Sequence, residues 1–255
     1  MAEVKTVLAL DVGNSRVAMG VVGEDVSHSR RVPTGELDGL GEVLAELWEQ
    51  MPEPRCVAAC SVNPANLARV ESAVRQRLGQ EVLVVGRDLP LPIQTDLPEP
   101  HSIGTDRLCS AAMAYFRLQS ACVVADFGTA ITIDCVSDNG IFLGGAILPG
   151  LHVGAEALAR RTALLPEVRL ARPEWVFGKD TRQAIVGGLV YGARGALREL
   201  TEAYATELGR WPPVIATGGD AELVAGGYDI VQAIVPDLCL LGVALAYQKT
   251  QLEEK

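Results

Sequence analysis

Residues 8–22 read LALDVGNSRVAMGVV, an apolar run that ends on an aspartate, turns at a glycine and resumes as a second apolar run. Apolar runs on both sides of a short polar turn are typical of two β-strands joined as a hairpin. Gly13 lets the backbone of this turn approach a ligand closely, because it has no β-carbon. The stretch therefore predicts a hairpin that presents the Asp11 carboxylate beside a compact turn.

The same pattern returns at residues 122–136, which read CVVADFGTAITIDCV. Asp126 matches Asp11 and Gly128 matches Gly13, at an offset of 115 residues (126 minus 11) in a chain of 255. An internal repeat at nearly half the chain length indicates a duplicated structural unit. We therefore predict two domains, residues 1–119 and residues 120–255.

Strand and helix patterns alternate along the rest of the chain. Apolar spacing predicts helices near residues 37–50, 65–78, 106–118, 153–161, 181–208 and 238–251. Short apolar runs predict further strands near residues 27–32, 56–62, 81–86 and 213–217, and the proline-rich residues 87–104 predict a loop. This order favours an α/β architecture with mixed sheets flanked by helices.

Composition narrows the classes of partner. Asp and Glu outnumber Lys and Arg by 32 to 22, a formal net charge of -10, which argues against binding to a nucleic-acid backbone. We find no segment suited to spanning a membrane and no secretory signal pattern, so we expect a cytoplasmic protein. The six cysteines include no C-x-x-C pair and lie mostly in apolar segments, so we interpret them as buried thiols rather than disulfides or a zinc site.

The two D-x-G turns suit a phosphate ligand. Backbone amides in such turns can bind an anion, and Asn14, Ser15 and Thr129 add neutral donors. The carboxylates of Asp11 and Asp126 would repel bare phosphate, so a cation or a water shell must lie between each carboxylate and the phosphate. Mg²⁺ suits this position, because it is commonly held by one or two carboxylates plus substrate phosphates. Two such turns facing each other across an inter-domain cleft would hold a nucleoside triphosphate; the alternative is that each is a hairpin turn and nothing more.

A second candidate site is the sequence IGTDRL, residues 103–108. Asp106 and Arg107 fall in the first turn of a predicted helix, where backbone amides are unpaired. Asp106 could accept a hydroxyl proton, with Arg107 binding a carboxylate or phosphate; alternatively, Asp106 only favours the helix start and Arg107 is solvated. No Walker loop is present, since GKDT at residues 178–181 has aspartate directly after the lysine.

Six motifs occur in a fixed order: DVGNSR, GTDR, DFGTAITID, GGAILPG, GKDT and ATGGDA. Together they resemble the motif set of the type III pantothenate kinases, within the superfamily of acetate and sugar kinases, actin and heat-shock ATPases. The resemblance spans roughly residues 7–220. It implies duplicated ribonuclease-H-like (actin-like ATPase) domains and ATP-dependent phosphorylation of pantothenate to 4'-phosphopantothenate, the first step of coenzyme A biosynthesis.

The resemblance also implies roles for individual residues. Asp106 would be the catalytic base, and Asp11 would lie near magnesium, directly or through water. Asp126 would bind a monovalent cation, K⁺ or NH4⁺. The residues implied in ATP binding are Asp11, Val12, Gly13, Asn14, Ser15, Arg16, Val17, Ala18 and Thr129. Those implied in pantothenate binding are Gly104, Thr105, Asp106, Arg107 and Thr181.

The resemblance further implies a homodimer, with ATP and pantothenate as ligands and neither nucleic acid nor membrane as a partner. One position departs from the family pattern: Leu97 stands where the family often has a tyrosine that contacts substrate. Two alternative functions keep the same nucleotide site. One is a nucleotide-binding accessory or regulatory protein without kinase activity, and the other is a kinase of a different small alcohol.

Overall fold

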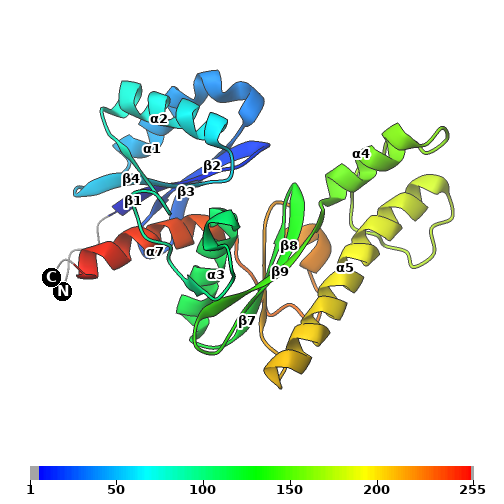
Figure 1. Cartoon of the computed structure of the whole chain (residues 1–255). Helices are drawn as coiled ribbons and strands as arrows, with labels where there is room; N and C mark the ends of the chain where they lie inside the picture. The colour runs from blue at the N-terminus through cyan, green and yellow to red at the C-terminus, as the bar shows by residue number, and fades with distance from the viewer. Residues whose placement is uncertain (1–5, 254–255) are drawn as a thin grey trace. The chain divides into compact units, whose positions relative to one another are not determined.

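The computed structural model describes residues 6–253, in which the chain divides into two compact units. The first unit contains residues up to 117, residues 140–142 and residues from 237 onward; the second contains residues 118–139 and 143–236. Each unit is built on its own β-sheet and its own apolar core (Figure 1). The two units are therefore described one at a time.

The first unit is a five-stranded sheet in the order β3-β2-β1-β4-β5. Strand β1 pairs antiparallel with β2 and parallel with β4. The strands are β1 (Thr6–Val12), β2 (Arg16–Val22), β3 (Val26–Pro33), β4 (Arg55–Ser61), β5 (Val82–Val84) and the short β6 (Gln94–Thr95). The helices are η1 (Thr34–Gly39), α1 (Leu40–Glu49), α2 (Pro64–Leu78), η2 (Pro100–Ser102), α3 (Thr105–Leu118) and α7 (Leu238–Glu253).

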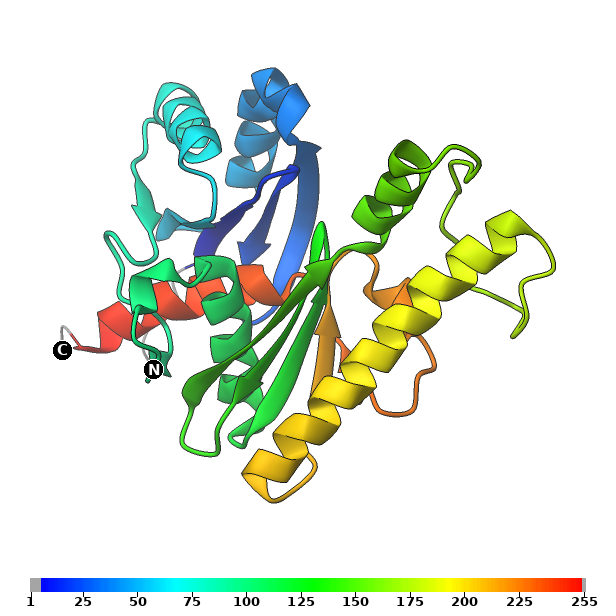
Figure 2. The ribbon, with the colours of Figure 1, turned by 45° about the vertical axis from the view of Figure 1, so that its right-hand side comes forward.

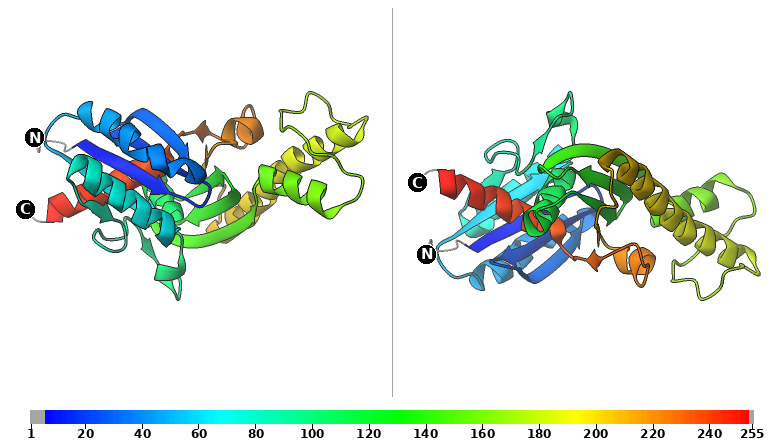
Figure 3. Two further views of the ribbon diagram at one scale, coloured as in Figure 1. Left: turned by 90° about the horizontal axis from the view of Figure 1, so that it is seen from above. Right: turned by 90° about the horizontal axis from the view of Figure 1, so that it is seen from below.

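Alternation along β1 directs its side chains to opposite faces of this sheet. Leu8, Leu10 and Val12 pack with Leu40 and Leu44 of α1 in one buried core. Helix α7 contacts β1, β2 and β4, and the views from above and below show it on the face opposite α1 and α2 (Figure 3). Asp11 belongs to the alternate set of side chains and therefore faces α7.

The second unit repeats the strand order of the first. Five strands of its sheet run β9-β8-β7-β10-β11, with β7 antiparallel to β8 and parallel to β10, and β6 adds a sixth strand by pairing in parallel with residues 141–142 of β9. The strands are β7 (Cys122–Phe127), β8 (Ala130–Val136), β9 (Ile141–Pro149), β10 (Val214–Thr217) and β11 (Ala233–Ile234). The helices are α4 (Leu151–Arg161), α5 (Thr181–Leu208) and α6 (Ala221–Ala225), and α5 contacts β8 (Figure 2). The shared strand order supports the duplication inferred from the repeat.

Local signals in the sequence account for where the helices begin and end. Helix α2 starts after Asn63, whose side chain accepts a hydrogen bond from the Asn66 amide at 3.0 Å, and it ends at Gly79, which has φ = 63°. Helix α5 starts after Asp180 and ends at Gly209, which has φ = 71°. Polar N-caps and left-handed glycine C-caps satisfy the unpaired groups at helix ends.

One strand was not predicted from the sequence, and two predictions differ from the structure. The glycine-rich residues 141–149 form strand β9, and Gly145 fits there because a β-carbon would overlap the Ile133 carbonyl and the Asp134 carboxylate. The predicted loop at residues 87–104 contains β6 and η2. Residues 237–253 pack with the first unit, because α7 covers β1, β2 and β4, whereas the sequence predicted a domain of residues 120–255.

Candidate active site

The first D-x-G turn lies at the end of β1 in the first unit. The Gly13 amide donates a hydrogen bond to the Arg16 carbonyl at 3.0 Å, which closes the hairpin between β1 and β2. Asp11 is half-buried, whereas Asn14 and Ser15 are exposed. The predicted arrangement of a carboxylate next to an accessible turn is therefore present in the structure.

Residues outside the motif hold this turn in place. The Asn66 side chain donates to the Gly13 carbonyl at 3.0 Å, and the Asn63 side chain donates to Oδ1 of Asn14 at 3.0 Å. The Thr34 hydroxyl donates to the Asn14 carbonyl at 3.1 Å. The turn is thus held in place by the start of α2 and by the residue after β3. The sequence did not predict this supporting role for Thr34, Asn63 and Asn66. Asn63-Pro64, an N-cap signal, was the available clue.

The other residues of the predicted ATP loop differ in how far their side chains are buried. Val12 and Val17 are fully buried, and Ala18 is nearly so. Their side chains belong to the core, so any contact they make with a nucleotide would come from the backbone. Arg16 is half-buried.

The start of α3 is joined to the end of β4. The Thr105 hydroxyl donates to the Ser61 carbonyl at 3.1 Å and accepts from the Ser61 amide at 3.1 Å. Ser61 pairs with Val12, the residue after Asp11, across the parallel β1 and β4. Asp11 and Asp106 are 95 residues apart in sequence (106 minus 11), yet both lie near the carboxyl ends of β1 and β4 in one sheet.

Asp106 has the properties of a proton acceptor. Its side chain is half-buried, and burial raises the pKa of its carboxyl above the usual value, although the Arg107 amide and charge oppose this shift. The Arg107 amide donates to Oδ1 of Asp106 at 2.8 Å. Gly104 has no room for a β-carbon, which would overlap Oδ1 of Asp106. A carboxylate with a raised pKa is a stronger general base than an ordinary one.

Arg107 packs beside an aromatic ring. Its guanidinium lies 5.6 Å from the centre of the Phe142 ring, a cation–π contact that orients the side chain. Phe142 lies in β9, and its carbonyl accepts a hydrogen bond from the Thr95 hydroxyl at 3.1 Å. Leu97, at the position where the family often has tyrosine, is half-buried, and its amide donates to the Thr95 hydroxyl at 3.2 Å.

The second D-x-G turn, in the second unit, is also closed by its glycine amide, but it is one residue shorter than the first. The Gly128 amide donates to the Ala130 carbonyl at 3.1 Å, and Thr129 is exposed. The Gly150 amide donates to the Thr129 carbonyl at 3.0 Å, and a β-carbon on Gly150 would overlap the carbonyls of Gly128 and Thr129. Gly150, in the motif GGAILPG, is therefore required for the close approach of α4 to this turn.

A further loop packs on Asp126. Gly218 has φ = 96°, and a β-carbon there would overlap Oδ1 of Asp126. The Asp220 amide donates to the Phe127 carbonyl at 2.9 Å, and the Asp220 carboxylate lies 3.5 Å from Nε2 of His152. Gly218 and Asp220 belong to the motif ATGGDA, for which the sequence predicted no individual roles. The signal was the repeated pattern of a buried strand that ends in small residues before a helix.

Thr181 is an exposed residue in the first turn of α5. Asp180 caps this helix by accepting from the Gln183 amide at 2.9 Å, and the Gln183 side chain accepts from the Lys179 amide at 2.9 Å. These bonds are similar to a capping box, except that the Gln183 side chain accepts from the residue before the N-cap, so GKDT has a structural role as a helix start. These bonds do not test the implied role of Thr181 in substrate binding, which stays a prediction.

Comparison with known proteins identifies the family. Residues 7–203 match the family model described as type III pantothenate kinase. A type III pantothenate kinase from Dehalococcoides mccartyi strain 195 is 34% identical over 252 residues, which cover 96% of this chain and 98% of the relative. The chain belongs to the type III pantothenate kinase family. The resemblance inferred from the six motifs is thereby confirmed.

Solved structures confirm the predicted fold class. A conserved protein of the Baf transcriptional activator family from Campylobacter jejuni superposes with a TM-score of 0.62 at 20% identity, covering 97% of this chain and all of the other. MreB5 of Spiroplasma citri bound to ADP gives a TM-score of 0.52 at 11% identity, with 98% of each chain covered. At these identities the likeness concerns the fold, which is the actin-like ATPase fold of two α/β units.

Membership of a kinase family implies ATP as co-substrate and a divalent metal ion. The half-buried carboxylate of Asp11 is a hard oxygen ligand of the kind that Mg²⁺ prefers, and it lies beside an exposed turn. Within residues 6–253, no helix combines the length and apolar character needed to cross a bilayer.

Proposed function

We propose that this protein transfers the γ-phosphate of ATP to the primary hydroxyl of pantothenate, giving 4'-phosphopantothenate in the first step of coenzyme A biosynthesis. The observation that carries the proposal is the family match over residues 7–203, because this range contains both D-x-G turns and Asp106. The placement of Asp106 and Asp11 at one sheet edge supports it.

Most of the proposed roles fall on residues of the first unit. The turn of residues 13–15 binds phosphate oxygens through its backbone, and Asp11 holds Mg²⁺ directly or through water. The magnesium ion, when bound, neutralises charge on the phosphates. Asp106 accepts the proton of the pantothenate hydroxyl as its oxygen bonds to the γ-phosphorus, and the bond from the γ-phosphorus to the β-γ bridging oxygen breaks to release ADP. Gly104, Thr105 and Arg107 orient the acceptor, and Thr181 contacts it.

Asp126 holds a monovalent cation, K⁺ or NH4⁺, in this proposal, and Thr129 contacts ATP. The carboxylate of Asp126 and nearby backbone carbonyls are oxygen donors suited to such an ion. Exchange of K⁺, NH4⁺ and Na⁺ in turn should change the rate of the wild-type enzyme. The Asp126→Asn variant should lose most of that dependence, and equal rates in all three salts would exclude the assignment.

A coupled assay of ADP release tests the activity. ADP formation that requires pantothenate, and that sugars, glycerol or acetate do not replace, supports the proposal. ATP binding without turnover would favour a regulatory nucleotide-binding protein. ADP formation with another alcohol, but not with pantothenate, would favour a different small-molecule kinase.

A homodimer in solution is part of the proposal. Leu164, Val176 and Phe177 of the second unit are exposed by 91%, 78% and 74%. Exposed large apolar residues that gather on a surface are typical of an interaction site, and Val176 and Phe177 are consecutive in the chain. Light scattering should give twice the chain mass, and Phe177→Ser should weaken the dimer. Phe116→Ser, at a 54% exposed residue of the first unit, is the matched control and should leave the dimer intact.

A further inference from the structure

Three of the six cysteines gather beside Asp11. Cys60 ends the buried part of β4, Cys109 lies in α3 and Cys239 lies in the first turn of α7. Cys60 and Cys109 have no solvent exposure, and Cys239 is 8% exposed. Five of the six cysteines are buried free thiols, as the sequence predicted, and Cys56 is half-buried. The sequence did not predict that cysteines from three separate elements would form one cluster.

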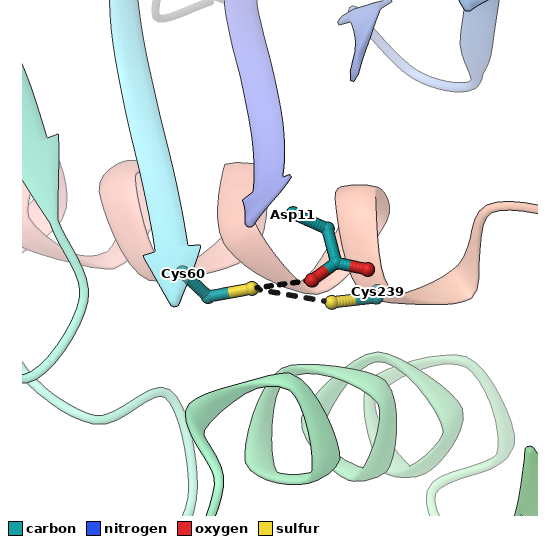
Figure 4. Close-up of side chains that lie close together, drawn as sticks. All are labelled: Asp11, Cys60 and Cys239. Carbon is teal, nitrogen blue, oxygen red and sulfur yellow. Dashed lines mark hydrogen bonds between the residues drawn. The ribbon is translucent and has the colours of Figure 1, made fainter. Parts of the chain in front are cut away.

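The cluster brings sulfur and oxygen ligands together. The sulfurs of Cys60 and Cys239 are 3.4 Å apart, and the Cys60 thiol donates to Oδ1 of Asp11 at 3.6 Å (Figure 4). These three ligand atoms all lie within 4.8 Å of one another. The fully buried Cys109 of α3 adds a third thiol near these two, and its interaction with Cys60 raises the pKa of the Cys60 thiol.

The fold itself imposes this arrangement. Asp11 and Cys60 are direct neighbours in the parallel register of β1 and β4, so their side chains leave the same face of the sheet. Helix α7 covers that face and supplies Cys239. Gly242, one turn further along α7, allows close contact with α3, because a β-carbon there would overlap the Cys109 carbonyl.

The observed spacings suit a tetrahedral metal centre. Zinc–sulfur bonds of about 2.3 Å and zinc–oxygen bonds of about 2.0 Å place tetrahedral ligands about 3.8 Å apart for two sulfurs and about 3.5 Å apart for sulfur and oxygen. The measured separations of 3.4 Å and 3.6 Å differ from these by a few tenths of an ångström or less. The third pair, the Asp11 oxygen and the Cys239 sulfur, lies within 4.8 Å, so the three atoms are close enough together to bind one ion.

We propose that Asp11, Cys60 and Cys239 form a binding site for a thiophilic divalent cation of the Zn²⁺ class. Thiolate ligands select such ions over Mg²⁺, which requires oxygen ligands. Binding converts the two thiols to thiolates, and both protons pass to solvent. The fourth position remains available for water.

The proposal predicts a spectroscopic signal that does not depend on catalysis. Co²⁺, added to the metal-free full-length protein as a probe for Zn²⁺, should give sulfur-to-metal charge-transfer absorption in the near ultraviolet and visible bands of a tetrahedral ion. One equivalent of Zn²⁺ should remove these bands. A wild-type protein that shows no charge-transfer band overturns the proposal without reference to any variant.

Variants locate the site. Cys239→Ala should weaken Co²⁺ binding by at least about 100-fold, because loss of even a residue that only orients a ligand can cost 10- to 100-fold. Cys135→Ala is the matched control, since Cys135 is 3% exposed and lies in the second unit. Circular dichroism and thermal unfolding without metal establish that each variant is folded, and Cys239→Ser replaces Cys239→Ala if the latter does not fold. An unchanged band in a folded Cys239 variant, or equal loss in Cys135→Ala, contradicts the assignment.

A regulatory consequence rests on the proposed kinase function. Since Asp11 would serve both ions, Zn²⁺ at this site should compete with magnesium and ATP. Micromolar Zn²⁺ should slow ADP release by wild type and by Cys135→Ala, with recovery on adding a chelator, and should affect Cys239→Ala much less. Cobalt binding without inhibition would retain the metal site and reject only its overlap with the kinase site.

Discussion

At the scale of the single residue, burial determines the chemistry of Asp106. Its carboxyl lies at the start of α3 with its pKa raised by burial, although the Arg107 amide and guanidinium favour the ionised form. Charge alone would predict the opposite shift. Desolvation exceeds the effect of a neighbouring cation here, and the result is a carboxylate suited to accept a proton.

The Asp106→Asn variant should lower turnover by about 10²- to 10⁴-fold, the usual contribution of a general base. ATP binding should persist, because the variant leaves the D-x-G turns unchanged. Coupled measurement of ADP and calorimetry with an ATP analogue report the two effects separately. Asp38→Asn is a suitable control, since the Asp38 side chain is fully exposed in η1. Near-normal turnover in Asp106→Asn would remove Asp106 from the mechanism.

The same residue predicts a pH dependence of stability. A pKa raised in the folded state means that protonated Asp106 stabilises the fold below the unfolded value of about 3.9, and that this contribution is lost as pH rises through the folded pKa. Asn is neutral throughout, so Asp106→Asn should gain stability relative to wild type as pH rises over this window. Urea unfolding at a series of pH values measures the difference. If Asp106→Asn instead lost stability relative to wild type between acidic and neutral pH, the raised pKa of Asp106 would be contradicted.

At the scale of the element, the two hairpins show which parts of a site are encoded locally. The turns, their glycines and their aspartates could be recognised from 15-residue stretches, because hairpin chemistry depends on neighbouring residues. Strand β9 was not predicted, since glycines at 144 and 145 obscure its alternation. Its place in the sheet depends on space beside β8 that only the folded unit provides.

Gly150 tests the contact between an element and a turn. Its φ of -63° is accessible to any residue, so the effect of Gly150→Ala should come only from overlap with the carbonyls of Gly128 and Thr129. We expect a loss of about 1–3 kcal/mol in the free energy of unfolding, as for other overpacked sites. Gly195→Ala, inside α5 with open space around it, should instead gain about 0.5–1 kcal/mol. Urea unfolding compares the two, and equal effects would show that overlap is not the cause.

At the scale of the whole molecule, the carboxyl-terminal helix α7 belongs to the first unit, together with the amino-terminal strands. Helix α7 follows the second unit in sequence but covers β1, β2 and β4 of the first. Residues 238–247 of this helix are buried on all sides, as expected for a helical segment inside a unit. Both ends of the described chain therefore pack on one sheet.

The Gly242→Ala variant should reveal this shared packing. Overlap with the Cys109 carbonyl should lower the opening free energies of α7 and β1 together by about 1–3 kcal/mol, while α5 and β10 change little. Native-state hydrogen exchange read by mass spectrometry resolves these segments. Gly188→Ala, in open space on α5, serves as the control and should leave α7 and β1 unaffected. Equal losses in α7 and α5 would show that the two units open as one.

The sequence by itself determined the α/β class, the duplication, both D-x-G hairpins and the family, because each rests on short-range periodicity or on residues a few positions apart. Only the tertiary structure placed Asp106 beside the edge that carries Asp11, attached α7 to the first unit and gathered Cys60, Cys109 and Cys239. The physical reason is that strand register and helix packing bring together residues that are far apart in sequence, and no local pattern encodes which distant partner each strand or helix will meet.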